Sequence, residues 1–141
     1  MKPAATPSAP WVLYGSRGSG SAAIEAALVL CGQPYREVRA SEWEPDSAIE
    51  ALRRVNPLGQ IPTLLMPDGL VMTESAAILI HLGLRHPGSG LLPEAPTARA
   101  TVLRALVFIA ANCYAAISVH DYPERWTTAG TRPAQLKVRA G

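Results

Sequence analysis

The 141-residue sequence contains few cysteines and no long run of one charge. Its two cysteines, Cys31 and Cys113, are too few and too far apart for the disulfide framework that holds small secreted domains together. Both lie in apolar stretches, where a free thiol behaves as a small hydrophobic group, so we expect both to be buried. This cysteine usage favours a reducing compartment, and we expect a cytoplasmic protein.

Charge and hydropathy argue against a nucleic-acid partner, a secretory signal and a membrane span. The 13 basic and 11 acidic residues are spread along the chain, and no basic run is long enough to follow a nucleic-acid backbone. The first ten residues lack the apolar core of a secretory signal and are expected to form a flexible tail. The apolar stretch 102–119 is interrupted by Arg104 and Asn112, so we expect a core helix there and not a membrane span.

Several chemistry-bearing motifs are also missing. The chain has no Walker-type phosphate loop and no Gly-x-Gly-x-x-Gly, so a nucleotide site is not expected. No Cys-x-x-Cys occurs, which argues against glutaredoxin-like redox chemistry. The three histidines, His81, His86 and His120, show no metal-ligand spacing, and we expect no metal site.

What remains is a clear alternation of strand and helix patterns, typical of an α/β domain. The predicted elements follow the order β-α-β-α-β-β-α, over residues 11–14, 22–31, 35–39, 47–54, 60–66, 70–73 and 75–86. Because strand–helix–strand crossovers are right-handed, the first two strands should be parallel. Asp68-Gly69 joins the last two strands as an antiparallel hairpin. In the last helix the apolar positions that share one side are Ala76, Leu79, Ile80 and Gly83.

A stretch rich in proline and glycine then predicts a linker and a second domain. The predicted organisation is a tail, an α/β domain, a linker and a partial all-helical domain, over residues 1–10, 11–86, 87–96 and 97–141. The helix expected from Thr97 to Val119 is apolar on more than one face and should be buried by several neighbours. The residues that follow this helix show little periodicity, so they are not expected to form the neighbours that it needs. Either the product is truncated or frame-altered, or another chain covers this helix.

Serines cluster between the first strand and the first helix. Ser16, Ser19 and Ser21 lie near the amino end of that helix, where free N–H groups and the positive helix end favour an anion. The same serines could act only as helix caps.

Two more segments combine turn and polar residues. If the Ile61-Pro62 bond is cis, the backbone of Ile61 turns toward the first loop and could pair with an extended peptide. A trans proline at a strand edge is the alternative. At Glu74-Ser75 a carboxylate and a hydroxyl meet at a helix start, where they could form a cap. Glu74 could instead hold an ammonium group while the helix N–H groups hold a carboxylate, and one amino acid carries both charges.

Together and in this order, these segments resemble the glutathione transferase family. Asn56-Pro57-Leu58-Gly59-Gln60-Ile61-Pro62-Thr63-Leu64 and Glu74-Ser75-Ala76-Ala77-Ile78 are similar to the family's cis-proline loop and to its glutamyl-binding Glu-Ser pair. The resemblance implies a thioredoxin-like βαβαββα domain over 11–86 and the start of the family's all-α second domain. Within the family, the sequence resembles bacterial members that have a serine in the first loop.

The resemblance also implies roles for individual residues. Ile61, between Gln60 and Pro62, would pair through its backbone with the cysteinyl part of glutathione. Glu74 and Ser75 would hold the amine and carboxylate of the γ-glutamyl part.

For the thiol, Ser19 falls where serine-type members carry their catalytic hydroxyl, although which of Ser16, Ser19 and Ser21 contacts the sulfur stays open. Gly20 stands where cysteine-type members carry a reactive thiol, which argues against that mechanism.

The implied function is a glutathione S-transferase with glutathione as co-substrate and no metal. Its bound thiol would attack a small electrophile or reduce a peroxide, and the protein would work as a homodimer. The alternative is a non-catalytic module that keeps the fold but lacks a complete electrophile site. The identity of the electrophile is beyond what these residues disclose.

Overall fold

The computed structural model describes residues 9–128, so most of the predicted tail over 1–10 and the end of the second predicted domain lie outside the described residues. The chain divides into two compact units, Met1–Pro96 and Thr97–Gly141. Each unit is described by itself.

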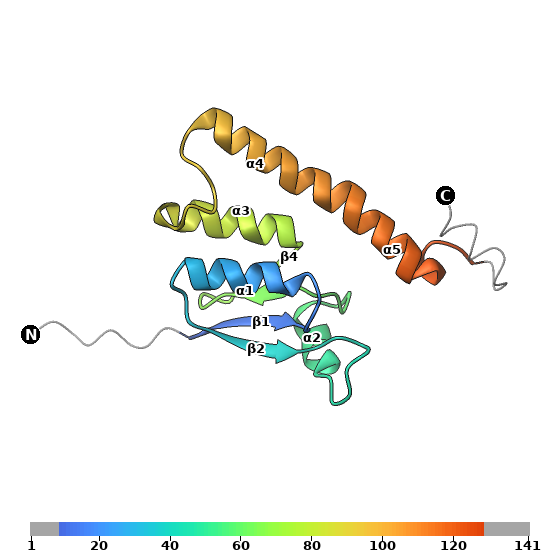
Figure 1. Ribbon diagram of the computed structural model, residues 1–141. Coiled ribbons are helices and arrows are strands. Elements are labelled where there is room, and N and C mark those ends of the chain that lie inside the picture. Colours follow the sequence, from blue (N-terminus) through green and yellow to red (C-terminus); the bar gives the residue numbers. More distant parts are fainter. Residues whose placement is uncertain (1–8, 129–141) are drawn as a thin grey trace, which may run out of the picture. The chain divides into compact units, whose positions relative to one another are not determined.

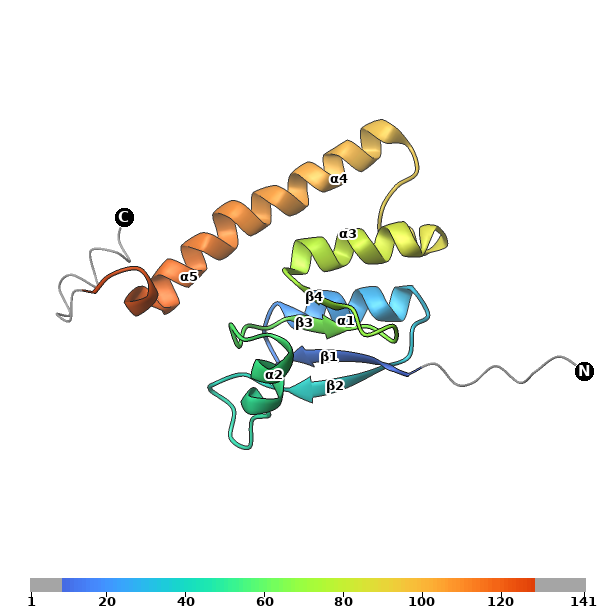
Figure 2. The same ribbon diagram turned by 180° about the vertical axis from the view of Figure 1, so that it is seen from behind.

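The first unit contains the four strands and three helices that the sequence predicts, in the predicted order. They are β1 (Trp11–Gly15), α1 (Ser21–Leu30), β2 (Tyr35–Arg39), α2 (Ile49–Val55), β3 (Thr63–Leu65), β4 (Val71–Thr73) and α3 (Ser75–Arg85). The strands form one sheet in the order β2-β1-β3-β4. As predicted, β1 and β2 are parallel, and β3 and β4 form an antiparallel hairpin. Helices α1 and α3 cover one face of the sheet and α2 covers the other (Figures 1 and 2).

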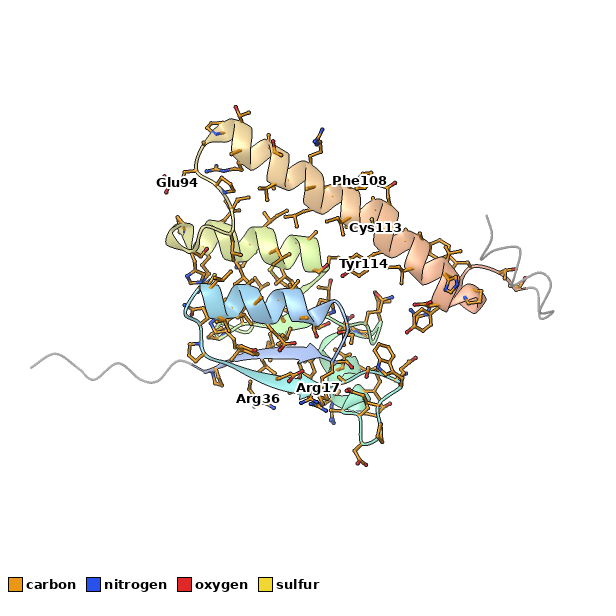
Figure 3. All side chains as sticks on the ribbon, in the orientation of Figure 1. Arg17, Arg36, Glu94, Phe108, Cys113 and Tyr114 are labelled. Carbon is orange, nitrogen blue, oxygen red and sulfur yellow. The ribbon has the colours of Figure 1, made fainter. Side chains whose placement is uncertain are left out.

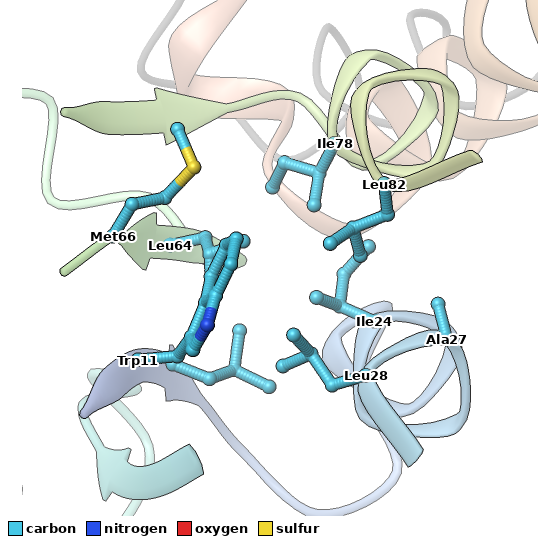
Figure 4. Close-up of a cluster of buried hydrophobic side chains, with 9 residues drawn as sticks. Trp11, Ile24, Ala27, Leu28, Leu64, Met66, Ile78 and Leu82 are labelled. Atoms are coloured by element: carbon cyan, nitrogen blue, oxygen red, sulfur yellow. The ribbon is translucent and has the colours of Figure 1, made fainter. Parts of the chain in front are cut away.

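The alternation of side chains along β1 supplies both faces with a core. Leu13 points toward α1 and α3, whereas Val12 and Tyr14 point toward α2. The larger cluster, shown in Figure 4, consists of Trp11, Leu13, Ile24, Ala27, Leu28, Leu64, Met66, Ile78 and Leu82. The smaller cluster consists of Val12, Tyr14, Ala40 and Leu52, and Ile61 packs against it. The second cluster therefore anchors the segment that precedes β3.

The buried side of α3 differs from the predicted one. The structure buries Ile78, Leu82 and Gly83, while Ala76, Leu79 and Ile80 are half-buried. Ile78 and Leu82 are four residues apart and therefore lie on the same stripe, which faces Ile24 and Leu28 of α1 in the larger cluster. Apolar residues occupy several sides of this helix, so periodicity alone did not select the stripe.

The two cysteines are less buried than predicted. Cys31 is half-buried at the end of α1, where it packs against the larger cluster. Cys113 is exposed, so the expectation that it is buried is wrong.

The described part of the second unit consists mainly of one continuous helix, Pro96–Asp121. It comprises α4 (Pro96–Phe108), a π-helical segment (Ile109–Tyr114) and α5 (Ala115–Asp121), and a 3₁₀ turn (Pro123–Arg125) follows. The helix is long and apolar enough to span a membrane by length and composition, a test that core helices of soluble proteins also pass.

No residue of this helix is buried in the described chain, although its several apolar faces favour a helix that neighbours cover. Apolar side chains project into solvent from more than one side of it, and Phe108 is 60% exposed (Figure 3). The described part of the second unit contains no other long helix that could cover them, which is the physical reason for their exposure.

We predict that the close contact between α3 and the linker limits what residue 83 can be. A Cβ atom at Gly83 would lie 2.6 Å from the Cβ of Leu92, which is buried, and 3.1 Å from its backbone nitrogen. Gly83→Ala should therefore lower the free energy of unfolding by about 1–2 kcal/mol, because the overpacking penalty exceeds alanine's gain in helix propensity.

The measurement is urea denaturation followed by circular dichroism. Gly88→Ala is the matched control, since an added Cβ there meets no atom within 4 Å, and its effect should stay within about 0.5 kcal/mol. Equal stabilities for the two variants would contradict the prediction.

Candidate functional site

Strand register brings the three predicted site segments to one end of the sheet. Tyr14 of β1 pairs with Thr63 of β3, and Thr63 pairs with Thr73 of β4. Neighbouring strands lie about 4.8 Å apart, so this row places the loop after β1, the residues before β3 and the residues after β4 side by side. Helices α1 and α3 both begin at this end, at Ser21 and Ser75. Two positive helix ends therefore face the same region.

The serine loop after β1 presents one of its three hydroxyl groups to the surface. Ser16 and Ser21 are buried, at 1% and 0% exposure, whereas Ser19 is half-buried. Arg17 and Gly18, at the tip of the loop, are exposed. Of the three candidate serines, Ser19 is the one that a ligand can reach without a change in the loop.

These serines are joined by short polar contacts. The Ser19 hydroxyl donates to the carbonyl oxygen of Ser16 at 2.8 Å, and the Ser21 hydroxyl lies 3.1 Å from the same oxygen. The two hydroxyl oxygens are 3.0 Å apart. Ser19 Oγ also accepts the backbone N–H of Ser21 at 3.2 Å, so this serine satisfies one of the free N–H groups at the start of α1. The capping role that the sequence suggested is thus present in part.

Neighbouring segments fix this loop from two sides. A Cβ atom at Gly15 would lie 2.5 Å from Ser21 Oγ, so only glycine fits there without a shift. Ser41, which follows β2 and is buried, places its hydroxyl 3.1 Å from Ser16 Oγ and 2.9 Å from Glu44 Oε2. The sequence analysis missed Gly15 and Ser41, and no local pattern marks Ser41 because its partner is 25 residues away.

The segment before β3 is held by one buried amide. The side chain of Asn56 donates to the Gln60 carbonyl at 3.1 Å and to Thr63 Oγ1 at 3.0 Å, and its oxygen accepts the N–H of Leu58 at 3.2 Å. Asn56 is 5% exposed, which makes these bonds costly to lose. The sequence analysis included Asn56 in a motif without assigning this role to it.

The Ile61-Pro62 peptide bond is cis, the conformation that the resemblance implies. The side chain of Ile61 packs against the smaller core cluster, and Gln60 is exposed. Strand pairing of β3 begins at Thr63, so the backbone of Ile61 lies outside the ladder of the described strands.

Glu74 does not cap α3, and the capping interpretation is wrong for its side chain. Its backbone adopts φ 64° and ψ 108°, and it makes no side-chain cap hydrogen bond. Its side chain is exposed and has no ion-pair partner within residues 9–128. A non-glycine residue at positive φ costs free energy, and such residues concentrate at binding sites. An available carboxylate thus stands beside the positive end of α3, with Ser75 half-buried next to it.

Two further observations concern other possible ligand sites in the described chain. Residues 9–128 contain no group of three or more His, Cys, Asp or Glu side chains that could hold a metal ion. One surface hollow lies at the carboxyl ends of α1 and α3, lined by Leu30, Cys31, Gly32, Arg85, His86, Pro87, Gly88 and Ser89. It is at the opposite ends of these helices from the candidate site.

The fold and this constellation define a thioredoxin-like domain. Residues 21–85 match the family model described as "Glutathione S-transferase, N-terminal domain". Residues 21–85 of the first unit therefore belong to the glutathione S-transferase N-terminal domain family.

Solved structures agree with this assignment. A glutathione transferase homologue from Sulfitobacter with bound glutathione superposes with a TM-score of 0.79 at 26% identity, over 93% of this chain and 62% of that chain. A sphingomonad glutathione S-transferase complexed with glutathione gives a TM-score of 0.65 at 26% identity, over 92% of this chain and 64% of that chain.

Curated relatives are similar in sequence. The uncharacterized GST-like protein YncG of Escherichia coli is 40% identical over 127 residues, which are 89% of this chain and 60% of that protein. A maleylacetoacetate isomerase of Rhizobium meliloti is 41% identical over 102 residues, which are 71% of this chain and 46% of that protein. The chain thus spans at most about 60% of the length of these two relatives.

Loss of the Asn56 amide should destabilise the site and the fold together. We predict that Asn56→Ala lowers the free energy of unfolding by about 1–3 kcal/mol, because it removes the donor of two internal hydrogen bonds and the acceptor of a third.

The control is Asn112→Ala, whose exposed amide donates to the Phe108 carbonyl at 3.0 Å. Its effect in the same denaturant titration should stay within about 0.5 kcal/mol. Comparable losses in the two variants would show that burial of Asn56 is not what makes its bonds important.

Proposed function

We propose that this protein binds glutathione at the end of the sheet and activates its thiol for attack on a small electrophile or peroxide. The observation that carries the proposal is the Tyr14, Thr63 and Thr73 row, which sets Ser19, Ile61 and Glu74 at the ends of three neighbouring strands. Glutathione is an extended tripeptide with two carboxylates, one ammonium and one thiol. Its charges complement two helix amino ends and one carboxylate.

Binding would use the backbone as much as the side chains. The N–H and C=O of Ile61 lie outside the strand ladder and would pair with the cysteinyl unit by strand addition, with Gln60 and Pro62 on either side. At the γ-glutamyl end, Glu74 would accept the ammonium group. Ser75 and the first N–H groups of α3 would hold the α-carboxylate. The open carboxylate and uncapped start of α3 support this assignment.

Thiol activation would come from Ser19 and the amino end of α1. A free thiol with a pKa of about 8.5 is only a few per cent thiolate at neutral pH. Lowering that pKa by about two units requires about 2.7 kcal/mol of preferential stabilisation of the thiolate. A hydrogen bond to a charged group contributes about 1.5–3 kcal/mol, and a helix end about 0.3–1 kcal/mol. Ser19 would act as a hydrogen-bond donor and not as a nucleophile, and its partial exposure favours it over Ser16 and Ser21.

Isomerisation is a second candidate reaction, favoured by the relatives that are named maleylacetoacetate isomerase. A thiolate that adds to a conjugated double bond converts it to a single bond that can rotate. Elimination then returns the thiol and the isomerised product. Conjugation consumes glutathione stoichiometrically, whereas isomerisation needs only catalytic amounts, so the two reactions are separable by measuring thiol loss.

The third candidate is a module that binds glutathione without turnover. It is favoured by the exposed apolar helix of the second unit, because the chain supplies little else to enclose an electrophile. A homodimer and a cytoplasmic location complete the proposal for either kind of protein.

Two measurements, retention on immobilised glutathione and catalytic turnover, distinguish the three candidate functions. We expect the chain to be retained on immobilised glutathione and to be eluted by free glutathione. Conjugation of a chromogenic aryl halide, or isomerisation of a cis-enone diacid at constant thiol concentration, then identifies the reaction. Retention without either activity favours the binding module, and no retention contradicts the proposed site.

Ser19→Ala should move the pH–rate profile of any thiol-dependent reaction. Loss of the hydroxyl donor raises the pKa of bound glutathione, so the alkaline rise in rate should shift upward by about one pH unit or more. Ser89→Ala is the control, because Ser89 is also half-buried and donates to a nearby carbonyl, that of His86 at 2.7 Å, but at the far ends of α1 and α3. An unchanged profile for Ser19→Ala removes Ser19 from the mechanism.

Glu74→Gly should separate stability from binding. Glycine relieves the positive-φ conformation, so the free energy of unfolding should rise by about 0.5–1 kcal/mol. Loss of the carboxylate should weaken glutathione binding by about 10- to 100-fold, measured by calorimetry.

Asp46→Gly provides the matched control, since Asp46 is the other described non-glycine residue at positive φ, at 58°. It should gain similar stability and keep its glutathione affinity. If both variants bind glutathione equally well, Glu74 does not hold the ammonium group.

A further inference from the structure

We propose that Ser21 is a positioning residue whose buried hydroxyl keeps the Ser16 carbonyl hydrogen-bonded when Ser19 donates its proton to bound glutathione. This inference rests on the proposed function, in which Ser19 donates to the sulfur. It assigns a role to a residue that no ligand can reach, because Ser21 is 0% exposed.

In the structure, the Ser19 hydroxyl already donates its single proton to a group inside the protein. That proton is directed at the carbonyl oxygen of Ser16, 2.8 Å away. A serine hydroxyl has one proton, so Ser19 cannot donate to this carbonyl and to a thiolate at the same time. Donation to the sulfur therefore requires that the bond to the Ser16 carbonyl be given up.

The carbonyl would then lose an acceptor bond inside the protein, unless another donor replaces Ser19. It also accepts the backbone N–H of Ser19 at 3.3 Å, and two lone pairs leave room for one further donor. Ser16 is 1% exposed, so water cannot easily fill that place. The loss of one of its hydrogen bonds would destabilise this buried carbonyl, and that cost would oppose activation of the thiol.

The Ser21 hydroxyl lies where it can be this further donor to the Ser16 carbonyl. Its hydroxyl oxygen is 3.1 Å from the Ser16 carbonyl oxygen and 3.0 Å from Ser19 Oγ. It accepts the backbone N–H of Ser16 at 3.2 Å, so its own proton is free to point at either of these two oxygens.

Two arrangements of the same atoms follow. Without ligand, the Ser19 proton points at the Ser16 carbonyl, and the Ser21 proton has two acceptors within reach, the same carbonyl and Ser19 Oγ. With a thiolate, the Ser21 proton points at the carbonyl and the Ser19 proton points at the sulfur. Every hydroxyl proton has an acceptor in both states, and the change needs only the rotation of two hydroxyl groups.

The surroundings keep these oxygens in place. Ser21 Oγ packs against Gly15, where a side chain does not fit, and Ser16 Oγ is hydrogen-bonded to Ser41. The carbonyl, the two hydroxyl oxygens and the start of α1 thus form one rigid group. We infer that this rigidity, together with the second hydroxyl, lets Ser19 donate to a ligand at little cost.

The test is a double-mutant cycle with the full chain, read out as the ultraviolet absorbance of the glutathione thiolate during a pH titration of the complex. Ser19→Ala should shift the titration upward by about one pH unit, a tenfold loss of thiolate below its midpoint. Ser21→Ala should shift it by about half a pH unit, roughly a threefold loss. Because Ser21 acts through Ser19, the double variant should titrate like Ser19→Ala alone.

The outcomes separate this inference from the proposed function. If Ser19→Ala shifts the titration and Ser21→Ala does not, or if the two shifts add in the double variant, Ser21 has no role through Ser19. If glutathione does not bind, or Ser19→Ala leaves the titration unchanged, the proposed function itself fails.

A second measurement uses the unaltered protein, in case Ser21→Ala does not fold. Crystal structures with glutathione and with S-methylglutathione, which cannot form a thiolate, should differ at Ser19. With glutathione, Ser19 Oγ should contact the sulfur while Ser21 Oγ stays within hydrogen-bond distance of the Ser16 carbonyl. Contact of Ser19 with the sulfur while Ser21 Oγ has left that carbonyl overturns the inference alone.

Discussion

The alignment of Tyr14, Thr63 and Thr73 across three adjacent strands is the constraint on which the candidate site depends. Hydrogen bonding between strands sets this register, and each strand then directs its neighbouring loop to the same end of the sheet. A slip of one residue in β3 would turn Leu64 away from the larger cluster, which the burial of that side chain opposes. Core packing on both faces of the sheet thus holds the loops in place without contributing a side chain to any ligand.

The loops differ in how they satisfy their polar groups, and the difference shows where a ligand fits. The Ser16 to Ser21 loop and the segment around Asn56 are closed by internal hydrogen bonds among buried atoms. Such networks are rigid, since each member is expensive to expose. Glu74 is the opposite case, because its backbone is held at positive φ and its carboxylate has no internal partner in the described chain. A preorganised binding site combines rigid loops with a charge that has no internal partner. The two hydrogen-bonded loops and the Glu74 carboxylate provide this combination.

The second unit poses a different physical problem from the first. The helix from Pro96 to Asp121 has no buried residue, although its apolar side chains lie on several sides. The chain spans about 60% of the length of its relative YncG. In the proposed function, residues of the first unit would bind glutathione and activate its thiol.

The sequence by itself determined the order of elements, the parallel pairing of the first two strands and the hairpin. These depend on short-range periodicity, turn residues and chain connectivity, which are local in the chain. Tertiary structure decided that α3 buries Ile78 and Leu82, that Cys113 is exposed, that Glu74 adopts positive φ and that Ser41 contacts Ser16. Each of these outcomes depends on which distant surface meets a residue, and no pattern within a few residues encodes that.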